Sequence, residues 1–204
     1  MPGTFIVFEG PDGSGTTLHA KLLEERLSRE GLGVLRTFEP TDGPIGAKIR
    51  ESLHSGEPIS PAPLQELFCK DRAWHLENVI QPALAEGTVV ICDRYLHSTL
   101  AYGQALGLQK NYLRELNKDF IQPDVLFFLL PPYEVCSERM SKRKKHDALE
   151  ENTLQRKVYD IYLELSKEFP EGHVIDNSGS KAKVSADIFA LVQEEMRESV
   201  KCKV

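Results

Sequence analysis

The chain has 204 residues, of which 41% are hydrophobic and 27% charged, and its formal net charge is −6. This length is enough for one well-buried core and short for two, so we expect a single domain over residues 1–204. The acidic balance argues against a general electrostatic surface for nucleic acid or anionic membrane. An anionic ligand would therefore have to be bound at a local site.

The cysteines and the N-terminal segment indicate the compartment. Four cysteines are far apart in the sequence, without a C-x-x-C pair, so the pattern favours neither a disulfide framework nor a zinc site. The first ten residues lack a basic segment followed by a long apolar one, and no run approaches the roughly 18 apolar residues of a membrane span. We expect a soluble protein of the reducing cytoplasm.

Short apolar runs alternate with helical patterns along the chain. The strand-like runs are residues 4–8, 33–38, 88–92, 125–130 and 173–176. Apolar residues at three- and four-residue spacing mark helices between them, and Gly31 ends the first helix. Pro82 interrupts the longest helical pattern, residues 63–86, and should kink or break it. The alternation predicts an α/β fold, a three-layer sandwich with a five-stranded parallel sheet covered on both faces.

A glycine-rich segment, GPDGSGTT, follows the first strand-like run and precedes the first helical pattern. It matches the phosphate-binding pattern G-x-x-x-x-G-K-[ST], except that Thr16 stands in place of lysine. The glycines allow backbone N–H groups to point at phosphate oxygens, and these donors do not depend on residue 16. The residues expected to bind ATP are Gly10, Pro11, Asp12, Gly13, Ser14, Gly15, Thr16 and Thr17.

The two threonines that close this segment differ in expected role. Thr17 stands where the pattern places the hydroxyl that binds Mg²⁺, whereas Thr16 cannot neutralise the β- and γ-phosphates. Deletion of a lysine would rotate the next helix by about 100° and misplace Leu22 and Leu23, so a substitution fits better. Loss of one charge-stabilising donor costs on the order of 10²–10³ in rate, which leaves slow catalysis. The alternative is a glycine turn that only starts a helix.

A second group of polar residues surrounds the third strand-like run. Asp93 and Arg94 end it, and ligands bind beyond the carboxyl ends of strands in open α/β sheets. Arginine can hold a phosphate through two parallel N–H bonds, and a carboxylate can hold water on Mg²⁺ or orient the arginine. Phe68 and Arg72, at i and i+4 of one helix, could stack on a base and hydrogen-bond its edge. The simpler alternatives are a surface ion pair for Asp93 and Arg94, a core position for Phe68 and a solvated charge for Arg72.

Six segments carry a family resemblance. They are FEGPDGSG, EPTDGPIGAKIRE, LFCKDRAWHLENVIQPAL, VVICDRYLHSTLAYGQ, QPDVLFFL and YLELSKEFP. Over nearly its whole length, and in this order, the chain resembles the thymidylate kinases. The resemblance implies a P-loop nucleoside monophosphate kinase fold, a homodimer, and phosphorylation of dTMP to dTDP by ATP with Mg²⁺. A side-chain general base is not required, because the attacking phosphate oxygen is already anionic at neutral pH.

The resemblance also assigns the acceptor site by position. It implies that Phe68 stacks on thymine and that Arg72 bonds the thymine O4. Ser98 and Thr99 would lie near the N3 edge of the base. Tyr102 would pack against the deoxyribose and disfavour a ribose 2′-hydroxyl.

The same resemblance implies the residues around the transferred group. Arg94 would bind the phosphate of dTMP. Glu9 and Asp93 would lie near the metal and the transferred group, with Thr17 and Asp93 as the metal ligands.

The chain departs from the family pattern at four places. Thr16 replaces the loop lysine, and Phe38 precedes EP where relatives usually have arginine. Gly103 and Gln104 reverse the usual Gln-Gly order, and Ala148 stands where arginine commonly follows the aspartate. These departures favour two alternatives: a kinase for another nucleoside monophosphate, or a catalytically impaired nucleotide-binding paralogue.

A basic segment occupies the position of the family's lid, about residues 139–152. The loop sequence PDGSG contains no arginine, so the chain resembles family members that carry this arginine in the lid. Lids exclude water and add positive charge near the transferred group. We expect Arg143 first, and Arg139 second, to supply part of the charge that Thr16 lacks. A solvated, charged helix end is the alternative.

Overall fold

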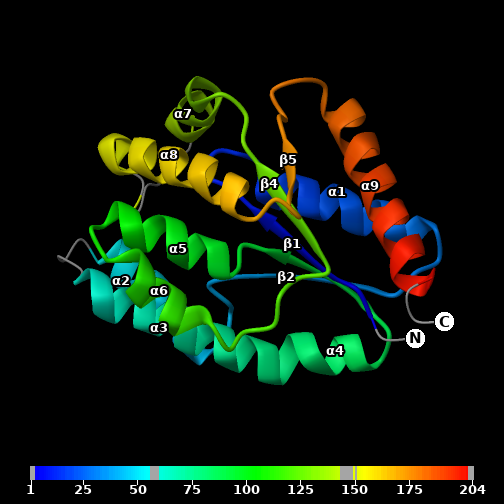
Figure 1. The fold of residues 1–204 in the computed structure, drawn as a ribbon, viewed down its shortest axis with the longest axis horizontal. Helices are drawn as coiled ribbons and strands as arrows, with labels where there is room; N and C mark the ends of the chain where they lie inside the picture. The colour runs from blue at the N-terminus through cyan, green and yellow to red at the C-terminus, as the bar shows by residue number, and fades with distance from the viewer. Residues whose placement is uncertain (1–2, 56–59, 143–148, 150, 202–204) are drawn as a thin grey trace.

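The computed structural model describes residues 3–55, 60–142, 149 and 151–201, and it contains a five-stranded sheet in the order β2-β3-β1-β4-β5 (Figure 1). All paired neighbours run parallel. The strands are β1 Phe5–Glu9, β2 Val34–Phe38, β3 Val89–Asp93, β4 Val125–Leu129 and β5 His173–Ile175. The expected α/β fold is confirmed, with strand limits within one residue of the apolar runs.

Helices cover both faces of this sheet. They are α1 Thr16–Arg29, α2 Pro44–His54, α3 Pro61–His75, α4 Gln81–Ala85, α5 Leu96–Ala105, α6 Lys110–Asn117, α7 Tyr133–Ser141, α8 Asn152–Glu168 and α9 Lys181–Lys201. In Figure 1, α1 and α9 lie on one side of the sheet, and α3 to α6 lie on the other. The molecule therefore has the expected three layers.

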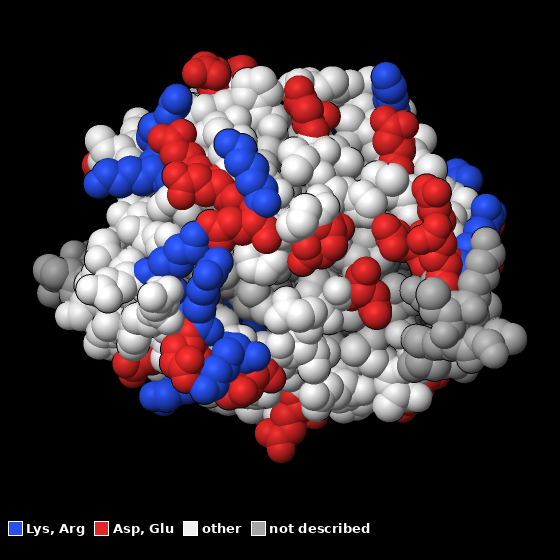
Figure 2. Space-filling view, viewed as in Figure 1, with Lys and Arg blue, Asp and Glu red and all other residues white. Residues whose placement is uncertain are grey.

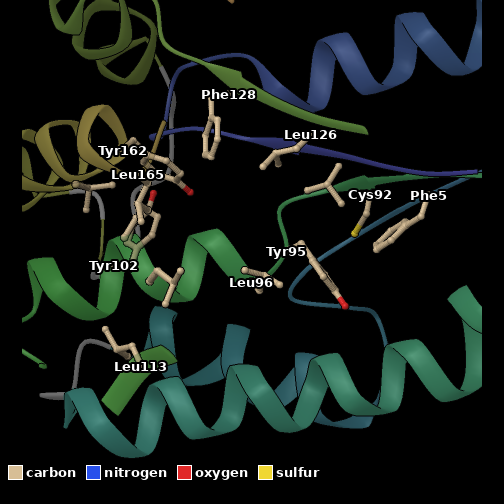
Figure 3. Close-up of a cluster of buried hydrophobic side chains, with 14 of the residues drawn as sticks. Phe5, Cys92, Tyr95, Leu96, Tyr102, Leu113, Leu126, Phe128, Tyr162 and Leu165 are labelled. Atoms are coloured by element: carbon tan, nitrogen blue, oxygen red, sulfur yellow. The ribbon is translucent and has the colours of Figure 1, made fainter. Parts of the chain in front are cut away.

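Side chains of the central strands divide between two buried clusters. In β1, Phe5 and Val7 face the cluster that includes α5 and α8, part of which is drawn in Figure 3. Ile6 and Phe8 face the cluster formed with α1 and α9. Both faces of β1 are apolar because both are covered, so its sequence is a continuous apolar run without polar alternation.

The long helical pattern around Pro82 passes through a π-helical turn. α3 ends at His75, the π-helical segment η1 covers Leu76–Ile80, and α4 follows with Pro82 in its first turn. A π-helical turn shifts the hydrogen-bond register by one residue, so a proline without an N–H group can follow it. The expected break is thus a local widening of the helix.

Acidic and basic side chains are interspersed over the face shown in Figure 2. Among the helices in the described part of the chain, none is long and apolar enough to cross a membrane.

Candidate active site

The glycine-rich loop connects the buried end of β1 to the start of α1. Gly13 and Gly15 adopt left-handed backbone conformations, with φ of 77° and 97°. A Cβ atom on Gly13 would also lie 2.4 Å from the carbonyl oxygen of Cys136. Both positions therefore require glycine, and the first N–H groups of α1, which have no acceptor within the helix, border the loop. This is the strand, loop and helix arrangement that binds phosphate.

Thr17 and Asp93 meet beside this loop. The Thr17 hydroxyl donates to Asp93 Oδ2 at 2.5 Å, and Thr17 is exposed. The other carboxylate oxygen, Asp93 Oδ1, is buried and has no hydrogen-bond partner among the described residues. Hydroxyl and carboxylate oxygens are the ligands that Mg²⁺ prefers, with phosphate and water completing its octahedron. The residues present therefore fit a magnesium ion.

Arg94 lies between the loop and a neighbouring pocket. Its φ is 70°, a left-handed conformation that is rare outside glycine. Its guanidinium donates to the Gly10 carbonyl oxygen at 2.8 Å and pairs with Asp12 Oδ1 at 2.6 Å. Its charged carbon also lies 5.4 Å from the ring centroid of Tyr102. Strained backbone of this kind is found where a side chain must be held in one place.

The pocket beside Arg94 is formed by α3, α5 and the residues after β2. Its lining residues are Asp12, Glu39, Pro40, Leu53, Gln65, Phe68, Arg72, Arg94, Tyr95, Ser98, Thr99, Tyr102 and Leu149. All six residues expected to bind the acceptor substrate are among them. The structure thus brings together side chains from two helices and a strand end that are well separated in the sequence.

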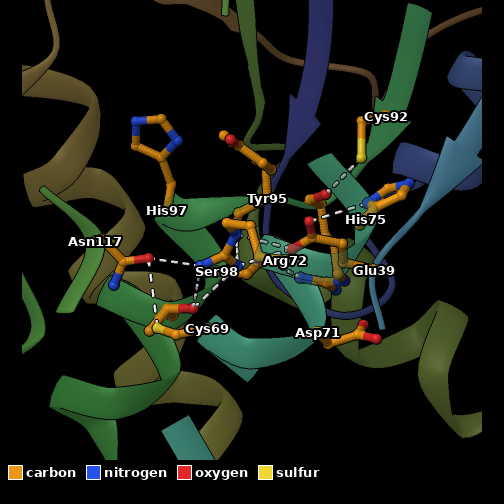
Figure 4. A network of polar contacts seen from close by, with 12 residues as sticks. Glu39, Cys69, Asp71, Arg72, His75, Cys92, Tyr95, His97, Ser98 and Asn117 are labelled. Atoms are coloured by element: carbon orange, nitrogen blue, oxygen red, sulfur yellow. Dashed lines mark hydrogen bonds and ion pairs between the residues drawn. The ribbon is translucent and has the colours of Figure 1, made fainter. Parts of the chain in front are cut away.

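Arg72 lies at the centre of a buried polar network (Figure 4). Its side chain is 1% exposed, and it pairs with Glu39 Oε2 at 2.8 Å from Nη2 and 3.0 Å from Nε. Further N–H groups donate to Asn117 Oδ1 at 2.5 Å and to the carbonyl oxygen of Tyr95 at 2.9 Å. The Thr99 hydroxyl accepts from both terminal nitrogens at 3.1 Å. Every nitrogen of the guanidinium is therefore bonded within the protein.

Glu9 is also buried, at the end of β1. Its Oε1 accepts hydrogen bonds from the backbone N–H groups of Tyr95 and Ser98, at 2.8 and 3.1 Å. Its Oε2 accepts from the hydroxyls of Ser98 and Tyr162, at 2.7 and 2.8 Å. Burial raises the pKa of Glu9, although these donors and Arg94 oppose the shift. Its contacts hold the first turn of α5 against the loop.

Arg139 extends from α7 to the back of the phosphate loop. It donates to the carbonyl oxygens of Gly13 and Ser14, at 3.3 and 3.1 Å, and to that of Asn177 at 2.9 Å. These contacts place its charge next to the loop that lacks a lysine. Arg143, the other expected lid cation, lies outside the described residues.

A comparison with known protein families identifies the chain. The family model described as "Thymidylate kinase" matches residues 8–188. The chain belongs to the thymidylate kinase family. A "Probable thymidylate kinase" of Pyrococcus horikoshii is 43% identical over an alignment of 204 positions, which covers 96% of this chain and 98% of the relative. A "Thymidylate kinase" of Brachyspira hyodysenteriae is 36% identical over 196 residues, covering 95% of each chain.

Two of the four departures from the thymidylate kinase pattern, Phe38 and the Gly103-Gln104 pair, fall on described residues of the acceptor side. Phe38 is partly exposed at the end of β2 and does not line the pocket. A Cβ on Gly103 would lie 2.5 Å from a Leu113 methyl carbon, so glycine allows α5 and α6 to approach closely. Gln104 donates to the Leu100 carbonyl oxygen at 2.9 Å, within its own helix. The lid departure, Ala148, lies outside the described residues.

The sequence patterns did not indicate one residue of the pocket, Gln65, and one residue bonded to the phosphate loop, Gln155. Gln65 precedes Phe68 by three residues and Arg72 by seven, which is the spacing of one helix face. That spacing could have indicated Gln65. Gln155 is different, because its contact with Asp12 at 2.7 Å joins segments 143 residues apart and has no local signal.

Proposed function

We propose that this chain transfers the γ-phosphoryl group of ATP to dTMP, giving dTDP and ADP. Membership of the thymidylate kinase family supports the reaction. The observation that carries the proposal for this site is the position of Arg94. Because Arg94 contacts the phosphate loop at Gly10 and also lines the pocket, a donor on the loop and an acceptor in the pocket would meet at its guanidinium.

The acceptor would occupy the pocket with its phosphate towards Arg94. Phe68 would stack on the base, and Tyr102 would pack against the sugar, near enough to Arg94 to exclude water from the phosphate. Arg72, Ser98 and Thr99 would border the polar edge of the base. To receive a phosphate, Arg94 would exchange its ion pair with Asp12 for the phosphate oxygens, which match its fork of N–H groups.

The donor would lie on residues 10–17, with its phosphates at the start of α1. Thr17 and Asp93 would hold Mg²⁺, which neutralises negative charge on the donor phosphates when bound. Glu9 would position Ser98 and the first turn of α5 through its hydrogen bonds. Catalysis would then consist of alignment and electrostatic stabilisation.

The positive charge that Thr16 lacks would come from the two lid arginines, Arg139 and Arg143. Arg139 supports this proposal, because it already contacts the loop carbonyl groups of Gly13 and Ser14. Arg143 would act from the segment after α7, within a lid of about residues 139–152.

ADP release from Mg²⁺-ATP in the presence of dTMP, dUMP, dCMP, dGMP or UMP tests the function. We expect dTMP to give the highest kcat/KM. Absence of turnover with dTMP at high enzyme concentration would refute the proposal, and a higher kcat/KM for another monophosphate would reassign the substrate.

Two further expectations accompany the function. A homodimer follows from the family resemblance, and light scattering after gel filtration should give twice the chain mass of 23.0 kDa. A cytoplasmic location agrees with a reaction that consumes ATP, and cell fractionation tests it.

A further inference from the structure

Gln65 is a polar residue of the pocket whose side-chain amide has no hydrogen-bond partner in the described part of the chain. The residue is fully buried on α3, and neither Oε1 nor Nε2 has a hydrogen-bond partner among the described residues. It lines the same pocket as Phe68 and Arg72. A buried amide without partners is costly, so such a group is usually completed by a ligand or an ordered water.

Arg72 has little capacity left for a ligand in this arrangement. Its five N–H donors are matched by Glu39, Asn117, Thr99 and the carbonyl oxygen of Tyr95. Withdrawing it would leave the carboxylate of Glu39 buried without its closest positive charge, which is strongly unfavourable. Arg72 therefore acts as a fixed part of the pocket wall.

The other polar side chains near the base, on α5, are bonded within the protein. The Ser98 hydroxyl donates to Glu9 Oε2, and the Thr99 hydroxyl accepts from Arg72. Gly103 has no side chain, and the Gln104 amide bonds the Leu100 carbonyl oxygen outside the pocket lining. The Tyr95 hydroxyl is unpaired, but its ring packs edge-on against Phe5 at the start of β1, 5.2 Å between centroids (Figure 3). Phe5 begins β1, whereas the phosphate loop follows the end of that strand.

We propose that Gln65 is a specificity-determining residue that hydrogen-bonds the imide edge of the thymine base, an inference that rests on the proposed dTMP site. Oε1 accepts from the N3–H group, and Nε2 donates to an adjoining carbonyl oxygen of the base. An amide offers one acceptor and two donors, which complements the N3–H and carbonyl groups of a uracil-type ring. Phe68, one helical turn away on the same face, is placed to support the plane of that ring.

Gln65→Met is the variant that tests this inference. Methionine has a similar length without the amide, so the steric fit to the base is retained while both hydrogen bonds are lost. We expect the Kd for dTMP, measured by calorimetry without ATP, and the KM to rise about tenfold, with kcat within about twofold of the parent. The melting temperature without ligand should not fall, because the variant removes an unpaired buried amide.

N3-methyl-dTMP separates base recognition from a general structural effect. Its methyl group blocks the N3–H donor, so the parent should bind it more weakly than dTMP. In Gln65→Met this ratio of Kd values should shrink about tenfold, since the steric cost of the methyl group is common to both proteins. The preference for dTMP over dCMP should change less, because a rotated amide can pair with cytosine as well.

Gln104→Met is the matched control, since it removes an amide on α5 that bonds within its own helix, and it should bind both nucleotides as the parent does. Equal losses of affinity for dTMP and N3-methyl-dTMP in Gln65→Met, which leave the ratio of their Kd values unchanged, would overturn the inference. If the parent phosphorylates dTMP and the ratio does not move, the inference alone fails. If the parent neither binds nor phosphorylates dTMP, the proposed function fails first.

Discussion

The hydroxyl of Thr17 and the carboxylate of Asp93 are joined at 2.5 Å although 76 residues separate them in the chain. Parallel pairing of β1 with β3 aligns Phe8 with Asp93, so the end of β3 lies beside the loop that leads into α1. Asp93 Oδ1 has no hydrogen-bond donor among the residues that the structure describes. This pairing of strands is what assembles two oxygen ligands from separate segments.

Replacing Asp93 with asparagine should make the reaction strongly dependent on higher Mg²⁺ concentrations. The neutral amide keeps the shape but removes the charge that would hold the metal, so kcat should fall on the order of 10²–10³. Thr17→Ser, which keeps the hydroxyl, should stay within a few fold of the parent, whereas Thr17→Val should resemble Asp93→Asn. Magnesium titrations of ADP release measure all three. Parent-like magnesium dependence in Asp93→Asn would exclude this carboxylate as a ligand.

Thr16→Lys should raise kcat. Thr16 occupies the lysine position of the phosphate-binding pattern, and a lysine there would add a preorganised charge at the β- and γ-phosphates worth on the order of 10²-fold in rate. Thr16→Met is the control, because it adds length without charge. The measurement is kcat for dTMP under saturating Mg²⁺-ATP. If Thr16→Lys leaves kcat unchanged, the absence of a lysine in the loop is not what limits the turnover rate of this enzyme.

Arg139→Ala should lower kcat and raise the KM for ATP. Arg139 bonds the carbonyl groups of Gly13 and Ser14, so its loss would remove both charge and support from the loop. Arg139→Lys keeps the charge without the forked geometry and should recover part of the activity. Lys142→Ala is the matched control, since Lys142 pairs with Glu138 on the surface of the same region, at 2.6 Å. Parent-like kinetics in both Arg139→Ala and Arg143→Ala would exclude compensation by the lid.

The fold could be predicted from the sequence because its strongest signals are local. The three central strands are buried on both faces, so they appear as unbroken apolar runs, and the glycines of the loop are required by its backbone. The position of Arg94 could also be predicted, because in the sequence it comes directly after the end of a strand-like run. The left-handed backbone conformation of Arg94 could not be predicted, since nothing in the neighbouring residue types requires it.

The polar interior of the pocket could not be predicted in the same way. Arg72 meets Glu39 and Asn117, which are 33 and 45 residues away, and such pairings depend on how α3 and α6 pack. Helical spacing shows that Gln65 shares a face with Arg72, but it does not show that one side chain is fully bonded and the other is not. Pairing between distant segments has no periodic signature, so the division of roles within the site had to come from the structure.

His97 should make the folded state less stable in mild acid. Its ring is buried edge-on to Phe128 and Phe169, and neither ring nitrogen has a hydrogen-bond partner among the described residues. Burial, helped by the positive charge of Arg72, lowers the pKa of His97 from 6.5 to about 3. Glu9 Oε1 lies 3.8 Å from His97 Nδ1, which is beyond hydrogen-bonding distance.

Between pH 6.5 and about 3, the unfolded chain therefore binds a proton at His97 that the folded chain does not. Stability must fall as the pH decreases through this window, by at most about 1.4 kcal/mol per pH unit from this residue. His97→Phe removes the proton uptake and retains an aromatic ring. From pH 7 to pH 5, the free energy of unfolding measured by urea should fall about 2 kcal/mol more in the parent than in His97→Phe. All other titrating groups are common to the two proteins, so equal losses would mean that His97 is protonated in the folded protein at the same pH as in the unfolded chain.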